Sequence, residues 1–314
     1  MLFPSSGRRF APKIKMTIMR MMKSSGSPTL PSITRHFNTF TAVLAFTFLS
    51  APQFRSGVNV VEVYAAVVDQ TGAPVVGLTS QEFTVLEDGV PQRISSFAEA
   101  DFPLSVALAV DRSFSMKSQL PAAVNAARTF LAELRPQDAA MIVAIGSEVE
   151  TMAPLSTDRE AQLRVLDALQ PWGTTGLYDA IVMSIDAIQS ARGRRALVVL
   201  SDGTDRYSRV SVSDALDRAR RADVMTYPIA LGRTRPPLFA DLAVLTGGRS
   251  YQPRDAAQLT TTMKTIASEL RHQYLLGYTP SRPIGSGEEQ WRAITVRVNR
   301  GGVTVRARDG YLAR

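Results

Sequence analysis

Oxygen-bearing side chains follow directly after two apolar runs of the sequence, and these side chains have the chemistry of a metal site. After the runs 106–110 and 196–200 come Asp111, Ser113, Ser115, Ser201 and Asp202. Between them, segment 173–176 places two threonines between glycines, whose backbone freedom allows a hydroxyl to turn inward. Carboxylate and hydroxyl oxygens suit Mg²⁺ or Mn²⁺, whereas zinc and copper fit poorly without a cysteine or histidine among the donors.

These side chains meet only if strands and helices bring their loops together. Between residues 102 and 274, apolar runs alternate with amphipathic stretches, which predicts an α/β fold with a doubly wound, mostly parallel sheet. Strands are expected at 104–110, 140–145, 196–200, 225–231 and 249–252, and helices at 122–134, 160–169, 177–189, 212–221, 237–245 and 256–272. Loops after neighbouring strands face one crevice at the switch in winding direction. Asp111 and Asp202 are therefore expected to face each other.

Strand-like patterns flank this region on both sides. They lie at 58–68 and 83–86 before it, and at 275–278, 291–298 and 303–308 after it. The last two are joined by a glycine-containing turn at 299–302, which is typical of a hairpin. Neither flank alone is long enough to bury both faces of a sheet. We therefore expect the flanks 56–100 and 275–314 to pair as a small β-sandwich-like domain, with the α/β domain 101–274 inserted in it.

The formal charge of +8 comes from the N-terminal segment, since residues 1–51 hold seven basic side chains and no acid. Beyond residue 52 the charges nearly balance, which excludes a phosphate-binding stripe and a nucleic-acid partner. Basic residues followed by the apolar run 40–49 and small residues at 50–51 predict a signal peptide over 1–51, with a true start at Met22 as one possibility. We expect an exported protein, periplasmic, secreted or on the cell surface, with no stable membrane span after cleavage; an uncleaved anchor is the alternative.

Three motifs of the sequence, taken together, resemble a known metal site. Asp-x-Ser-x-Ser after the first strand, a threonine before 177–180 and Ser-Asp-Gly after a later strand resemble the metal-ion-dependent adhesion site of von Willebrand factor type A domains. The resemblance covers about 103–274 and implies a Rossmann-like fold. The flanks, at 85–94 and 276–280, resemble an exported family related to these domains and common in Acidobacteria. The implied ligands of Mg²⁺ (or Mn²⁺) are Asp111, Ser113, Ser115, Thr175 and Asp202, with Thr174 the less suitable threonine.

This resemblance implies metal-dependent adhesion. In the family, direct donors are largely neutral hydroxyls and some acids act through water, so the metal stays electrophilic with one open position. A carboxylate from an Asp or Glu of a protein partner completes the shell. Taken singly, Ser113 or Ser115 is more often a helix cap and Thr175 an ordinary loop residue.

Two other classes of function are open alternatives. One is a structural envelope component with a vestigial metal site. The other is a metal-assisted hydrolase using Asp111 and Asp202, although no third acid is placed as a general base. The chain has no cysteine, and His272 is the only histidine beyond the leader, interpreted as solvent-facing. Thiol and His-based catalysis are therefore excluded, and no phosphate loop or nucleophile elbow occurs.

Several neighbours of the motifs are interpreted as structural. Asp179 is expected to have a structural role and Asp205 to be a surface acid, with an indirect role near the metal as an alternative. Phe114 and Trp172 are expected to pack against the core or a helix, with contact to a partner as the alternative. A cluster at 192–195 is predicted to be a solvated helix end with arginines that suit the helix dipole, namely Arg192, Arg194 and Arg195.

Overall fold

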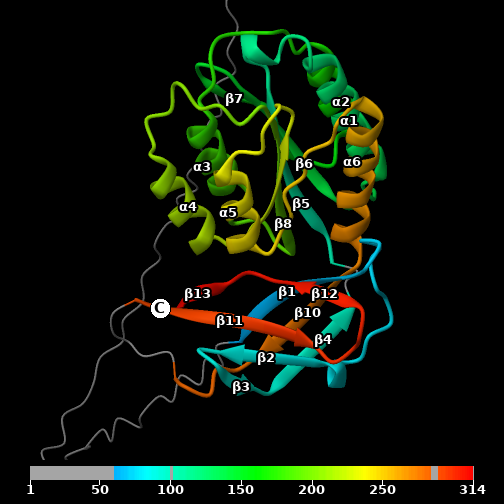
Figure 1. Cartoon of the computed structure of the whole chain (residues 1–314), viewed down its shortest axis with the longest axis vertical. Coiled ribbons are helices and arrows are strands. Elements are labelled where there is room, and N and C mark those ends of the chain that lie inside the picture. The colour runs from blue at the N-terminus through cyan, green and yellow to red at the C-terminus, as the bar shows by residue number, and fades with distance from the viewer. Residues whose placement is uncertain (1–59, 100–101, 284–288, 314) are drawn as a thin grey trace, which may run out of the picture. The chain divides into compact units, whose positions relative to one another are not determined.

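Four parallel strands form the centre of the α/β domain (Figure 1). The computed structural model describes residues 60–99, 102–283 and 289–313. The sheet has the order β7-β6-β5-β8-β9, with β5 at Leu104–Asp111, β6 at Ala139–Ile145, β7 at Val149–Ser156, β8 at Arg194–Ser201 and β9 at Met225–Ala230. Only β7 is antiparallel to its neighbour. The winding direction reverses between β5 and β8, so the predicted doubly wound sheet is confirmed.

Helices cover both faces of this sheet (Figure 1). One layer holds α1 (Leu120–Glu133), α2 (Arg159–Asp167) and α6 (Ala256–Arg271); the other holds α3 (Leu177–Ile188), α4 (Val212–Arg221) and α5 (Pro237–Thr246). Alternate residues of β5 supply the two cores, since Leu108 packs with the first layer and Ala109 with the second. Burial on both faces explains why the central strands are continuous apolar runs.

The flanks form two four-stranded antiparallel sheets that pack on each other. One sheet has the order β12-β1-β10-β4, with β12 at Val303–Arg306, β1 at Val61–Asp69, β10 at Gln273–Tyr278 and β4 at Ile94–Glu99. The other has the order β13-β11-β2-β3, with β13 at Gly310–Ala313, β11 at Gln290–Val298, β2 at Phe83–Glu87 and β3 at Val90–Gln92. Both sheets mix N- and C-terminal strands, so the predicted sandwich with an inserted α/β domain is confirmed.

Two local predictions are wrong, and one strand was not predicted. The turn 299–302 does not close a hairpin, because β11 pairs with β13 and β2 whereas β12 pairs with β1; the turn carries the chain between sheets. Residues 249–252 form only an isolated bridge, Ile229 to Tyr251. Strand β7 was not predicted, because it is a half-exposed edge strand containing Pro154, where a proline is tolerated.

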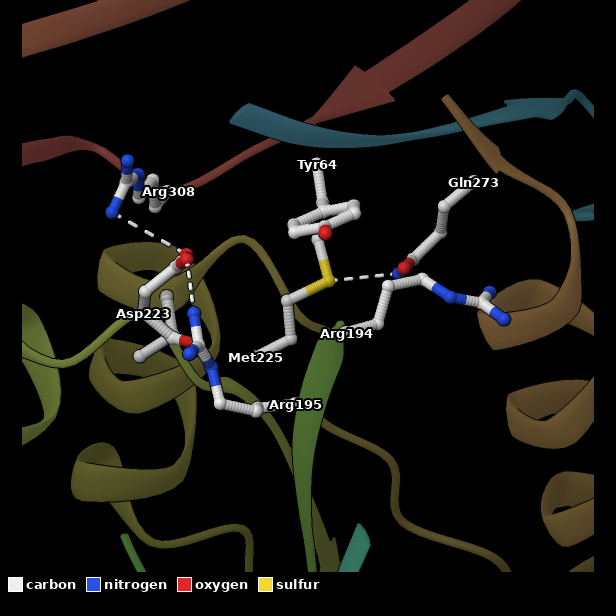
Figure 2. A pocket seen from close by; sticks show the side chains of 8 residues that line it. Tyr64, Arg194, Arg195, Asp223, Met225, Gln273 and Arg308 are labelled. Carbon is white, nitrogen blue, oxygen red and sulfur yellow. Dashed lines mark hydrogen bonds and ion pairs between the residues drawn. The ribbon is translucent and has the colours of Figure 1, made fainter. Parts of the chain in front are cut away.

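The inserted domain meets the sandwich through a charged, buried junction (Figure 2). Asp223, which precedes β9, pairs with Arg195 at 2.5 Å and with Arg308 at 3.3 Å. Beside them lies a cavity of about 10 Å³, room for a single water. Arg194 is only 2% exposed and its Nη2 donates to the carbonyl of Phe102. The predicted solvated arginine cluster is therefore wrong for Arg194, which lies inside the junction.

The leader prediction for residues 1–51 lies outside the described residues. Within the part of the chain that the structure describes, no helix is both long and apolar enough to cross a membrane.

Candidate metal centre

Asp111, Ser113 and Ser115 are brought together by the turn that follows β5. The backbone N–H of Ser113 donates to Asp111 Oδ1 at 2.9 Å, and the Ser113 and Ser115 hydroxyl oxygens lie 3.1 Å apart. Asp111 and Ser113 are buried, whereas Ser115 is exposed. Every second residue of the turn therefore presents an oxygen to one place.

Asp202 follows the neighbouring strand β8, at the same edge of the sheet. The preceding residue links the two strands, because Ser201 Oγ donates to Asp111 Oδ2 at 2.6 Å and accepts the backbone N–H of Gly203 at 3.0 Å. Asp202 Oδ1 accepts the N–H of Thr204 at 2.9 Å. Because Val110 pairs with Leu200, Asp111 and Asp202 lie at the same edge of the sheet, and the negative charge of Asp202 acts on the carboxyl of Asp111. Ser201 is not among the five predicted ligands, and its contact with Asp111 was not predicted, although its place in the Ser-Asp-Gly motif was the available signal.

Thr175 lies on a third loop, which backbone hydrogen bonds fasten to the other two. The carbonyl of Gly173 accepts the N–H of Phe114 at 3.1 Å, and the carbonyl of Thr175 accepts the N–H groups of Arg206 and Tyr207 at 2.9 and 3.0 Å. Thr175 is 2% exposed. The loop thus spans the space between the turn after β5 and the loop after β8.

The electrostatics of this cluster favour a cation. Burial raises the pKa of Asp111, and the negative charge of Asp202 adds to the rise, although hydrogen bonds from Ser201 and Ser113 oppose it. Neither Asp111 nor Asp202 forms an ion pair with any described residue. The adjacent Arg112 pairs instead with Glu150, at 2.6 Å. Two close carboxylates without a counter-charge are stabilised by a bound cation. The residues present therefore fit a hard divalent metal.

The donor set also limits which metals fit. Among the described residues, no group of three or more His, Cys, Asp or Glu side chains is placed to hold a metal. Any metal here depends on hydroxyl oxygens besides the two carboxylates, which favours Mg²⁺ or Mn²⁺ over softer ions.

Neutralising Asp111 is expected to stabilise the metal-free protein. A raised pKa means that the folded state binds the proton more tightly than the unfolded chain, so ionised Asp111 lowers stability at pH values above the raised pKa. We expect Asp111→Asn to be more stable than the native chain at pH 8 in chelator, and the difference to vanish below the ordinary pKa of 3.8. Denaturant unfolding in chelator across this pH range measures the difference. A less stable variant at pH 8 contradicts the expectation.

Two acids near the cluster support the nearby loops through hydrogen bonds to backbone N–H groups. Asp179 accepts the N–H groups of Arg209 and Val210 at 3.0 and 2.9 Å, so its predicted structural role is confirmed. Asp205 Oδ1 accepts the N–H of Leu177, the first residue of α3, at 2.7 Å. The prediction that Asp205 is merely a surface acid is therefore wrong, because its carboxylate supports the start of a helix.

The aromatic residues beside the ligands differ from expectation. Phe114 is 66% exposed, so its predicted core packing is wrong; the tight turn that gathers Ser113 and Ser115 directs the ring outward. Trp172 packs, but against Gly146 at the end of β6 and beneath the guanidinium of Arg112, 5.1 Å from the ring centroid. It remains 39% exposed.

Several solved structures are similar to this chain. A von Willebrand factor type A protein from Catenulispora acidiphila is similar in fold, with 13% identity over 80% of this chain and 73% of that chain and a TM-score of 0.51. An aerotolerance-related membrane protein from Bacteroides fragilis has 18% identity over 54% of this chain and 98% of its own, with a TM-score of 0.45. The protein BatB from Bacteroides thetaiotaomicron has 16% identity over 53% and 98%, with a TM-score of 0.43.

Two further comparisons concern the amino-acid sequence. No curated protein matches the chain. Residues 106–204, which include all five candidate ligands, match the sequence model of the von Willebrand factor type A domain. The Catenulispora acidiphila protein shows that the fold is similar. The sequence match identifies a von Willebrand factor type A domain over residues 106–204.

Proposed function

We propose that the protein is an exported, metal-dependent binding module that captures an Asp or Glu carboxylate of a protein partner. Von Willebrand factor type A domains are generally protein-interaction modules, which fits a binding rather than a catalytic role. The observation that carries the proposal is the oxygen cluster in which Asp111, Ser113 and Ser115 are directly linked and Asp202 follows the next strand. Export is proposed from the N-terminal sequence alone.

Each residue has a distinct part in the proposed mechanism. Ser113, Ser115 and Thr175 present neutral oxygens, while Asp111 and Asp202 supply the negative charge. Ser201 and the N–H of Ser113 hold the two oxygens of Asp111 in fixed directions. When bound, the divalent cation supplies an electrophilic centre that a carboxylate from outside completes. Neutral donors leave that centre attractive to the incoming charge.

A small carboxylate tests this proposal without a known partner. We expect the full chain to bind Mn²⁺ and the Mn²⁺-loaded protein to bind N-acetyl-aspartate amide, detected by paramagnetic relaxation of the probe's protons. N-acetyl-asparagine amide, which has the same shape without the charge, is expected not to bind. A native-state metal ligand also raises the midpoint of thermal unfolding over that in chelator.

The alternatives predict different results. Absence of any metal effect on unfolding contradicts the proposal and favours a structural component with a vestigial site. Turnover of ester substrates that disappears in Asp202→Ala contradicts it in favour of a metal-assisted hydrolase. Equal binding of the two amides shows that the centre does not select a carboxylate, which also contradicts the proposal.

A further inference from the structure

All three exposed aromatic side chains of the described residues lie on the loops of the candidate metal centre. Phe114 is 66%, Trp172 39% and Tyr207 61% exposed. Backbone hydrogen bonds fix their positions, because the N–H of Phe114 donates to Gly173 and that of Tyr207 donates to Thr175. Exposed aromatic clusters are costly to solubility and are enriched at binding surfaces. Their confinement to this edge therefore points to a contact surface around the site.

Trp172 is held ready for such a contact. One side of its ring lies against Gly146, where a Cβ atom would come within 2.7 Å of the indole, and the guanidinium of Arg112 lies over the ring. Arg112 is itself fixed by Glu150. A side chain already immobilised loses little conformational entropy when a partner covers it.

The same edge carries unpaired positive charge. Arg206, Arg233 and Arg235 are exposed, and among the residues that the structure describes none of their side chains forms an ion pair or hydrogen bond. Arg206 adjoins Tyr207. Arg233 and Arg235 lie on the loop after β9, where Gly232 and Pro236 contact Asp202 and Gly203, respectively.

Acids near these arginines form hydrogen bonds to backbone N–H groups or belong to the proposed metal site, and they do not pair with the arginines. The Oδ1 of Asp205 accepts the N–H of Leu177, and the oxygens of Asp179 accept the N–H groups of Arg209 and Val210. Asp202 is a proposed metal ligand. Asp179 and Asp205 keep their negative charge, but neither pairs with Arg206, Arg233 or Arg235. Each of these arginines is therefore open to an acid of a partner, and such complementary charge would raise both association rate and specificity.

We infer that the partner presents an acidic segment in which the coordinating Asp or Glu is flanked by aromatic or aliphatic side chains and then by further acids. The inference rests on the proposed function of the metal centre. The central carboxylate reaches the metal, the apolar neighbours contact Phe114, Trp172 and Tyr207, and the outer acids pair with Arg206, Arg233 and Arg235. This arrangement selects a sequence context, which a carboxylate–metal contact alone does not.

Three synthetic peptides test the inference on the full chain loaded with Mn²⁺. The first, acetyl-Glu-Phe-Asp-Phe-Glu-amide, carries the complete pattern; the second replaces both Phe by Gly, and the third replaces both Glu by Lys. We expect the first to bind about tenfold or more tightly than either of the others. Its advantage over the lysine peptide is expected to shrink at high salt.

Variants locate the preference on the surface. Phe114→Ser combined with Tyr207→Ser is expected to lose the preference over the glycine peptide, and Arg233→Gln combined with Arg235→Gln to lose that over the lysine peptide. Mn²⁺ affinity stays unchanged in both. Matched controls are Val90→Ser, exposed in the sandwich, and Arg221→Gln at the C-terminal end of α4, neither of which changes either preference.

The outcomes separate the inference from the function on which it rests. Equal binding of all three peptides to the Mn²⁺-loaded protein overturns the inference while leaving the metal-dependent function intact. Failure to bind Mn²⁺ or N-acetyl-aspartate amide overturns both. Tighter binding of a single-stranded oligothymidylate than of the first peptide also overturns the inference, because stacking and basic charge then serve a nucleic acid.

Discussion

We expect the replacement of Asp202 by alanine to abolish the stabilisation that Mg²⁺ gives at the proposed site. At a metal concentration one hundred times the dissociation constant, a ligand of the native state stabilises it by about 2.7 kcal/mol. Asp202→Ala deletes one of the two carboxylates proposed to balance the cation, so we expect nearly all of this increment to be lost. Differential scanning calorimetry with Mg²⁺ and with chelator measures it.

The neighbouring Asp205 provides the matched control. Its carboxylate accepts the N–H of Leu177 at the start of α3 and the hydroxyl of Ser208, so it supports local structure. We expect Asp205→Ala to lower metal-free stability by about 1–2 kcal/mol while keeping the increment from Mg²⁺. Asp202→Ala is expected to leave metal-free stability nearly unchanged, because its one backbone hydrogen bond is offset by relief of repulsion with Asp111. An Mg²⁺ increment preserved in Asp202→Ala contradicts the proposed ligand set.

A second large effect is expected far from the metal centre, at the ion pair buried in the sandwich. Arg292 Nη1 lies 2.9 Å from Glu87 Oε1, and both side chains are only 3% exposed. The hydroxyls of Tyr278 and Tyr311 donate to Glu87 Oε2, each at 2.9 Å, and burial with this carboxylate raises the pKa of Tyr311 to about 12. Arg292→Leu leaves a buried carboxylate without its cation, so the free energy of unfolding is expected to fall by about 3–5 kcal/mol.

An exposed ion pair next to it is the control. Arg282 pairs with Asp88, and the two side chains are 49% and 37% exposed. Arg282→Leu is expected to cost at most about 1 kcal/mol, because solvent screens the pair. Urea denaturation compares the two variants. If Arg292→Leu costs no more than Arg282→Leu, the buried pair does not contribute as argued; adding Glu87→Leu to Arg292→Leu is expected to recover part of the loss.

The layered fold was predictable because its signals are local and strong. Strands β5 and β8 are apolar on both faces, and the helices between them have one apolar side, so both periodicities are plain in the sequence. The gathering of Asp111, Ser113 and Ser115 was predictable for the same reason, since they lie at the end of such a strand and on the turn after it. Strand β7 lacked this signal because only one of its side chains, Ala153, is buried.

Other features depend on contacts between distant segments. The turn 299–302 has the composition of a hairpin, but its flanking strands β11 and β12 lie in opposite sheets, and Val296 and Val305 pack into the core between these sheets. Arg194 lies in a run of arginines with the composition of a solvated segment. It is buried because distant segments surround it, among them Leu134 and Leu270 of the α/β domain and Tyr64 of the sandwich. The exposure of Phe114 likewise follows from the turn geometry rather than from its hydrophobicity.

The place of the insertion in the sandwich has a consequence for the order of folding. Strand β4 leads into the inserted domain and β10 leads out of it, yet the two are adjacent and antiparallel, with Glu99 opposite Tyr274. For the sandwich, the whole inserted domain is the loop that connects this pair. While that loop is an unfolded chain, joining its ends carries a large entropic penalty, and the penalty shrinks once the domain has condensed and its ends lie together. The sandwich should therefore close last, on a domain that has already formed.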